Sequence, residues 1–141
     1  MKKTASAQWH GNLKDGKGTI STQSGALSNA PYGFKARFEE GPGTNPEELI
    51  GAAHAGCFTM AFSLFLQEAG YTADTLDTKA EVTLEKDSNG FTITAIHLTL
   101  IGKVPGLQEA EFKKLAETAK ENCPVSKLFN AKITLSATLQ G

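Results

Sequence analysis

Cysteine and histidine are both scarce in this chain: its 141 residues include only two cysteines, Cys57 and Cys123, and three histidines. The cysteines do not form the closely spaced pair of zinc sites and thioredoxin-like motifs, and no acidic cluster supplies further ligands. We therefore predict no metal site. Two isolated thiols in different surroundings instead indicate one attacking sulfur and one resolving sulfur, so the sequence points to thiol chemistry.

The sequence also lacks any imbalance of charge. Its formal net charge is −1, with acidic and basic residues interspersed. Neither the basic surface of a nucleic-acid-binding protein nor a polybasic membrane patch is expected. The fourteen glycines are scattered or lie in turns, which argues against a glycine motif for phosphate binding. The expected partners are neutral small molecules or other proteins.

No apolar run follows Lys2 and Lys3, so the first residues do not resemble a secretory signal. We therefore expect a cytoplasmic protein. Thiols are kept reduced in the cytoplasm, and a cysteine pair that does bridge there is usually catalytic or redox-sensing. A purely structural disulfide is the alternative interpretation of the two cysteines.

One long apolar run is present, from Leu49 to Leu66. It approaches the length of a membrane-spanning helix, but many of its residues are small, so we predict a buried central helix and no membrane span. Asn45 is a suitable cap, Pro46 suits the first helical position, and Glu48 lies where a capping box has its acid. The run is apolar on almost every side, which predicts burial on all sides. A domain of this size has difficulty enclosing such a helix, so we infer a homodimer.

The order of the remaining elements is typical of an α+β fold, and the length suits a single domain, residues 1–141. A turn is predicted at Asn89-Gly90, and a shift in the alternating pattern at Ile96 predicts either a bulge or a strand whose second half faces a different layer. Cys123 is expected at the start of a short helix, where the helix dipole favours a thiolate. Strands are predicted from Ala5 to His10, Tyr32 to Phe38, Leu76 to Glu85, Phe91 to Leu100 and Ile133 to Leu139, and further helices from Leu107 to Asn122 and from Pro124 to Phe129.

The segment from Asn45 to Cys57 reads Asn-Pro-Glu-Glu-Leu-Ile-Gly-Ala-Ala-His-Ala-Gly-Cys, with Arg37 before it and Cys123-Pro124 after it. Together these residues resemble the OsmC/Ohr family of thiol peroxidases along essentially the whole chain. The Pro-Tyr-Gly-Phe segment at 31–34 is more similar to the OsmC branch. The resemblance implies a mostly antiparallel curved sheet on a long central helix, in an intertwined cytoplasmic homodimer that reduces organic hydroperoxides and, less well, hydrogen peroxide.

The resemblance also implies a role for each site residue. Cys57 would be the peroxidatic thiol and Cys123 the resolving one, and the two would form a disulfide during turnover. Glu47 would hold Arg37 in place. No bound cofactor is expected, because an external dithiol of the lipoyl type would restore the thiols.

Physical chemistry sets a condition on Cys57. Burial in an apolar helix raises the pKa of a thiol, so Cys57 alone would be inert. Ionisation near neutral pH, from an ordinary pKa of about 8.5, needs roughly 2 kcal/mol of extra stabilisation of the thiolate. A guanidinium about 4 Å away supplies about 4 kcal/mol at an effective dielectric of 20. Arg37 is the candidate, and the alternative for Arg37 is an exposed strand residue.

The spacing of the acids adds a constraint. At about 1.5 Å per residue, Glu47 lies roughly 15 Å from Cys57 along a regular helix, too far for one arginine to reach both within one chain. If two such helices run antiparallel across a dimer axis, Glu47 of one subunit can approach Cys57 of the other. We therefore expect active sites shared between subunits. The neighbouring Glu48 has the competing role of helix capping.

Aromatic residues near Arg37 and Cys57 are candidates for an apolar substrate channel, with core packing as the alternative for each. A second alternative concerns His54, which lies three residues before Cys57 and could pair with it in acyl transfer, although no orienting group is evident. The competing functional class is a noncatalytic, stress-associated protein that binds a small molecule and keeps the fold. The substrate-binding candidates are Tyr32, Phe34, Phe38, Phe58 and Phe62, with Met60 beside them.

Overall fold

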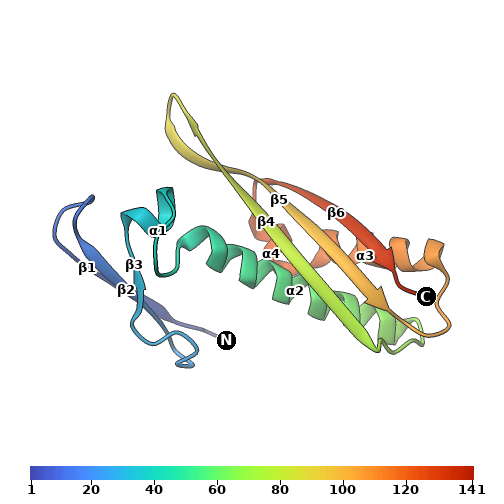
Figure 1. The fold of residues 1–141 in the computed structure, drawn as a ribbon. Helices are drawn as coiled ribbons and strands as arrows, with labels where there is room; N and C mark the ends of the chain where they lie inside the picture. The colour runs from blue at the N-terminus through green and yellow to red at the C-terminus, as the bar shows by residue number, and fades with distance from the viewer. The chain divides into compact units, whose positions relative to one another are not determined.

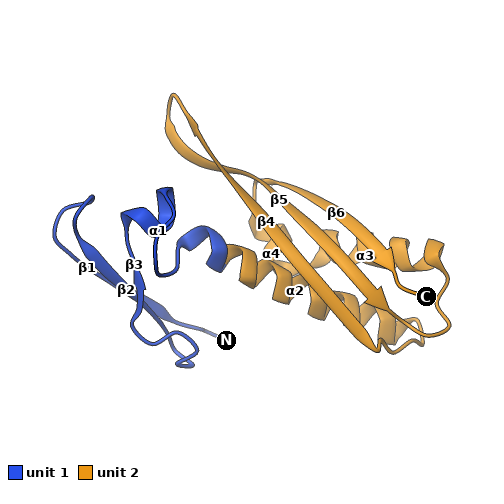
Figure 2. Ribbon diagram, viewed as in Figure 1, with its two compact units in different colours: residues 1–49 blue, residues 50–141 orange.

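The computed structural model describes all residues from Met1 to Gly141 and has the predicted α+β composition. The chain divides into two compact units, Met1–Leu49 and Ile50–Gly141, coloured separately in Figure 2. That residues 1–141 form one domain stays a prediction.

Unit 1 contains a small antiparallel sheet of β1 (Ala5–His10), β2 (Lys17–Thr22) and β3 (Ala30–Tyr32), in that order. The predicted first strand is thus confirmed. The Trp9 and Tyr32 rings pack edge to face, with centroids 5.5 Å apart. Both rings crowd Gly18, which has no room for a Cβ. The glycine therefore allows this aromatic pair to close over the sheet.

The prediction of a strand over Tyr32–Phe38 is wrong. The strand ends at Tyr32, and Phe34–Phe38 forms the short helix α1 after Gly33. Phe34, Ala36 and Phe38 fit the alternation of a strand, but Phe34 and Phe38 are also four residues apart, which places them on one helical face. Their ring centroids lie 5.1 Å apart. Arg37 is therefore presented by a helix.

The predicted start of the long helix α2 (Pro46–Glu68) is confirmed. The Asn45 Oδ1 atom accepts a hydrogen bond of 2.8 Å from the backbone N–H of Glu48, as expected of a cap at this position. The Glu48 carboxylate accepts a hydrogen bond of 2.7 Å from the Thr44 hydroxyl. Glu48 thus belongs to the local structure of the helix start.

One face of α2 is buried and the opposite face is exposed. Phe58 and Phe62 are fully buried, whereas Met60 is 76% and Leu64 is 51% exposed. The single chain therefore leaves part of α2 uncovered, as expected if a partner subunit covers the rest of the helix. By length and composition α2 could also cross a membrane, although core helices pass the same test.

The sheet of unit 2 contains β4 (Thr75–Asp87), β5 (Gly90–Lys103) and β6 (Lys132–Leu139), in that order. β4 and β5 are antiparallel, and β6 runs parallel to β5. The predicted turn is confirmed, with Gly90 at a φ of 111°. The predicted bulge is confirmed too, because the pairing shifts between Thr83 and Leu84 and leaves Thr94 as the extra residue.

Helices α2 and α3 (Glu109–Asn122) cover one face of this sheet, behind it in Figure 1. The core between them includes Leu98 and Leu100 of β5 and Phe112 of α3, all fully buried. The short helix α4 (Pro124–Leu128) follows α3 directly. Cys123 lies between the two helices with an extended backbone, as the proline after it requires.

Candidate functional site

The two cysteines of unit 2 face each other. Cys57 comes from the middle of α2 and Cys123 from the junction of α3 and α4. Both are free thiols, and the Cys123 thiol donates a hydrogen bond to the Cys57 sulfur over 2.9 Å. A disulfide has a sulfur–sulfur distance of about 2.05 Å, so a movement of about 1 Å would bring the atoms to bonding distance.

The two thiols differ in access to solvent. Cys57 is half-buried, whereas Cys123 is fully buried beneath it. An external reagent therefore meets the Cys57 sulfur first. This arrangement suits an attacking sulfur that is reached from outside and a resolving sulfur that is protected until it is needed.

Burial raises the pKa of the Cys57 thiol, as expected, and its interaction with the neighbouring Cys123 side chain raises it further. The backbone N–H of Val125, in the first turn of α4, donates to the Cys57 sulfur and acts in the opposite direction. The net effect is a raised pKa. Within unit 2, the surroundings of Cys57 thus favour the protonated thiol over the thiolate.

Cys123 has a second polar contact, which leads to a buried histidine. Its sulfur accepts a hydrogen bond from the Ser126 hydroxyl over 3.6 Å, and the Ser126 oxygen lies 2.7 Å from Nε2 of His54. His54 is fully buried, with its ring edge-on to Phe129 at 5.6 Å. Burial lowers the pKa of His54, which favours the neutral imidazole.

Sequence reasoning placed His54 beside Cys57 but missed Ser126. The side chain of His54 instead hydrogen-bonds Ser126 on α4. The available signal was the spacing of Cys123 and Ser126, which are three residues apart at the start of a short helix. No group of three or more histidine, cysteine, aspartate and glutamate residues is arranged to hold a metal ion.

In unit 1, Arg37 and Glu47 form an ion pair. Arg37 Nε donates to Glu47 Oε1 over 3.0 Å, and their side chains are 40% and 11% exposed. The second carboxylate oxygen of Glu47 is buried and has no hydrogen-bond partner. The arginine also lies over the Phe38 ring, 5.2 Å from its centroid. The pairing that the resemblance implied is therefore present, and Glu47 is the acid that Arg37 contacts.

A pocket of about 350 Å³ lies beside this ion pair within unit 1. It brings together Arg37 with three of the aromatic residues expected to contact substrate, and with three residues that were not among the substrate-binding candidates. The walls are aromatic and the arginine is the only charged residue among them, which suits an apolar molecule with one polar end. The lining residues are Trp9, Leu13, Tyr32, Gly33, Phe34, Arg37 and Phe38.

The other two aromatic candidates are core residues. Phe58 and Phe62 are fully buried in unit 2 and stack with centroids 6.3 Å apart. Phe62 also packs edge-on against Phe112 at 5.3 Å. For these two residues the alternative of core packing is therefore the one observed, because neither ring is exposed to a substrate in this chain.

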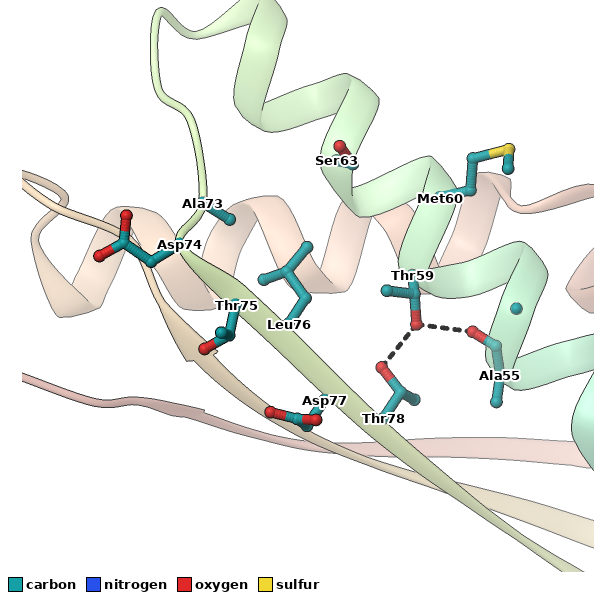
Figure 3. Close-up of a pocket in the computed structure, with 11 residues that line it drawn as sticks. Ala55, Thr59, Met60, Ser63, Ala73, Asp74, Thr75, Leu76, Asp77 and Thr78 are labelled. Carbon is teal, nitrogen blue, oxygen red and sulfur yellow. Dashed lines mark hydrogen bonds between the residues drawn. The ribbon is translucent and has the colours of Figure 1, made fainter.

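A second pocket, of about 710 Å³, lies between α2 and the start of β4 (Figure 3). Thr59 lines this pocket, and its hydroxyl donates to the Ala55 carbonyl over 2.6 Å and lies 2.6 Å from the Thr78 hydroxyl. Met60 also lines the pocket. No cysteine, histidine or arginine lines this pocket, so it has no group for thiol chemistry.

Comparison with known proteins identifies the chain. Residues 39–138 match the family described as OsmC-like protein. The chain belongs to the OsmC-like protein family. It is 52% identical over 138 residues to the peroxiredoxin OsmC of Escherichia coli (strain K12), covering 98% of this chain and 96% of that protein.

The Ohr branch is similar at lower identity. The chain is 30% identical over 125 residues to the organic hydroperoxide resistance protein OhrB of Bacillus subtilis (strain 168), covering 87% of this chain and 89% of that protein. The crystal structure of OhrB of Bacillus subtilis aligns with a TM-score of 0.68 at 27% identity, over 97% of this chain and 98% of that chain. These findings confirm the predicted family and the OsmC/Ohr-like α+β fold.

Proposed function

We propose that this OsmC-like protein is a cysteine-based peroxidase that reduces organic hydroperoxides to alcohols, and hydrogen peroxide less well. The observation that carries the proposal is the 2.9 Å contact between a half-buried and a buried cysteine from different helices. The relatives named a peroxiredoxin and an organic hydroperoxide resistance protein support it.

The first step uses the more accessible sulfur. The Cys57 thiolate attacks the distal oxygen of the hydroperoxide, the O–O bond breaks, and the alkoxide takes up a proton and leaves as the alcohol. Cys57 is thereby oxidised to a sulfenic acid. The Val125 N–H that contacts the Cys57 sulfur favours the thiolate in this step.

The second step uses the buried sulfur. Cys123 attacks the sulfenic sulfur of Cys57, the S–O bond breaks, and water leaves as the disulfide forms. An external dithiol, of which a lipoyl-type compound is the expected class, then reduces the disulfide by thiol exchange. The cycle requires no bound cofactor, and we propose that it takes place in the cytoplasm.

We further propose that the Arg37 guanidinium lowers the pKa of Cys57 and binds the peroxide oxygens, while Glu47 holds the arginine. A positive group is needed because the surroundings of Cys57 in unit 2 raise its pKa. The aromatic pocket beside Arg37 would accept the alkyl part of the substrate. In this proposal two subunits contribute to each site.

The exposed face of α2 supports the homodimer. Gly56 has open space around it and Met60 is 76% exposed, so a second copy could pack closely on this part of the helix.

We predict that Met60→Arg shifts the protein from dimer to monomer and lowers peroxidase activity with it, because a charge would be buried in the contact. Sedimentation velocity checks this. The matched control is Glu121→Arg on α3, which should stay dimeric, and an unchanged mass for Met60→Arg would contradict the proposed interface.

Steady-state peroxide consumption tests the proposed function. Cumene hydroperoxide and hydrogen peroxide should each be supplied with dihydrolipoamide or with thioredoxin as the electron donor. We expect the organic peroxide to be consumed faster, and dihydrolipoamide to support turnover better than thioredoxin. If cumene hydroperoxide binds but is not consumed with either donor, the protein is instead the noncatalytic binding protein that the aromatic pocket would also suit.

A further inference from the structure

Behind the two cysteines, a hydrogen-bonded series of side chains leads into the core of unit 2. His54 Nε2 lies 2.7 Å from the Ser126 oxygen, Ser126 donates to the Cys123 sulfur, and Cys123 donates to Cys57. The histidine comes from α2 and the serine from α4, so two separate helices bring the series together. Ser126 therefore contacts a sulfur that takes part in the proposed reaction.

The direction of these bonds indicates their effect. Because the Ser126 hydroxyl donates to the Cys123 sulfur, its oxygen is free to accept the Nε2 proton of a neutral His54. A hydroxyl that accepts a hydrogen bond becomes a stronger donor through its own O–H group. It then stabilises negative charge on the atom to which it donates. The acceptor here is the sulfur that becomes the nucleophile of the second step.

The burial of His54 is unusual for a residue that only fills space. Its side chain is fully buried, and its other ring nitrogen, Nδ1, has no hydrogen-bond partner. Burying an unpartnered polar atom costs free energy that an apolar side chain of similar size would not. The Phe129 ring edge-on to the imidazole further restricts its rotation. The imidazole is thus held with Nε2 toward Ser126.

We propose that Ser126, oriented by His54, stabilises the negative charge that the Cys123 sulfur carries once it has lost its proton, in the thiolate that then attacks the Cys57 sulfenic sulfur. Ser126 is then a catalytic residue of the second step, and His54 is its positioning residue. This proposal rests on the proposed peroxidase function and adds the residues that control its resolving step.

The step balances without any further reactant. The Cys123 sulfur attacks the Cys57 sulfenic sulfur, and the new S–S bond replaces the S–O bond. The departing hydroxide takes the proton released by the Cys123 thiol and leaves as water, so the serine and histidine end with the protons they began with. Cys123 supplies the electron pair and is oxidised, while the sulfenic sulfur is reduced to the disulfide level.

Single-turnover kinetics test the proposal on the full-length protein. One equivalent of cumene hydroperoxide is mixed rapidly with the reduced protein, the Cys57 sulfenic acid is trapped with dimedone at successive times, and the disulfide is counted by mass spectrometry. We expect Ser126→Ala and His54→Leu to slow disulfide formation by about 10- to 100-fold relative to sulfenic acid formation in the same sample. A loss of this size corresponds to one hydrogen bond to a charged atom.

Conservative variants separate this role from a structural one. Ser126→Thr keeps the hydroxyl and His54→Gln keeps a donor near the position of Nε2, so both should restore disulfide formation to within a few-fold of the wild-type rate. If the residues had only a structural role, the rate of disulfide formation in each variant would decrease with its folding stability, which thermal unfolding measures. If all four variants form the disulfide at the wild-type rate, or if the rates follow stability alone, the proposal is overturned.

A second arm avoids peroxide altogether. Oxidised glutathione converts Cys57 to a mixed disulfide, and attack by Cys123 then releases glutathione as the intramolecular disulfide forms. Ser126→Ala should slow this release as well. If the wild-type protein fails to consume peroxide yet this release depends on Ser126, the peroxidase function is wrong while the inference about Cys123 holds. If the release is independent of Ser126, the inference is wrong whatever the peroxide results are.

Discussion

Replacing Cys57 by serine is expected to abolish peroxide consumption, with a loss of at least about 1,000-fold, or about 4 kcal/mol of transition-state stabilisation. The physical reason is that a serine hydroxyl is not ionised near neutral pH and is a poor nucleophile without an activating base, whereas a thiolate attacks the O–O bond directly. The side chains are similar in size, and position 57 is only half-buried, so folding should be little affected. Loss of cumene hydroperoxide with excess dihydrolipoamide measures the effect.

The matched control is Cys123→Ser, which removes the other thiol. This variant should still consume one equivalent of peroxide, because Cys57 keeps its attacking sulfur, and should then stop at the sulfenic acid. The assignment of the two sulfurs would be reversed if Cys57→Ser still consumes peroxide, or if Cys123→Ser fails to consume the first equivalent.

Replacing Arg37 by methionine has the second largest expected effect. The surroundings of Cys57 in unit 2 raise its pKa, so in the proposal the guanidinium is what brings ionisation toward neutral pH. Removing a positive group that stabilises the thiolate raises the pKa of Cys57. The rate of peroxide consumption should therefore reach half its maximum at a higher pH, and fall roughly 30-fold at pH 7 for about 2 kcal/mol of lost stabilisation.

The pH profile of the second-order rate constant with cumene hydroperoxide measures this shift. Lys35→Met is the matched control, since it removes an exposed positive charge from the same short helix and should leave the profile in place. Glu47→Gln should produce a smaller loss, because the arginine keeps its charge but loses the 3.0 Å ion pair that holds it. If the pH profile of Arg37→Met is the same as that of the wild-type protein, Arg37 does not lower the pKa of Cys57 and its proposed role is wrong.

The elements predicted correctly from the sequence are those specified by local patterns. The start of α2 was predictable because Asn45 and Pro46 are strong signals within a few residues of each other. The hairpin at Gly90 was predictable for the same reason. The helix α1 was not, because the spacing of Phe34 and Phe38 satisfies both a strand and a helix, and five residues are too few for the pattern to distinguish them.

For the candidate site, too, only the features that are specified locally could be predicted from the sequence. The separate positions of Cys57 and Cys123 predicted two roles, but their 2.9 Å contact depends on how α2 meets the junction of α3 and α4. Ser126 and Trp9 were missed for this reason. Ser126 bonds a histidine 72 positions away, and Trp9 joins the Arg37 pocket from a different element. The only local signal was the spacing of Ser126 from Cys123, which does not reveal the contact with His54.

The most direct test of the central claim counts thiols before and after one equivalent of cumene hydroperoxide under denaturing conditions. The wild-type protein should lose both titratable thiols and two hydrogens in mass, with no gain of intermolecular species, whereas Cys57→Ser should keep its Cys123 thiol. Two thiols that remain free after the peroxide has been added, or a Cys123 thiol that is oxidised without Cys57, would contradict the account.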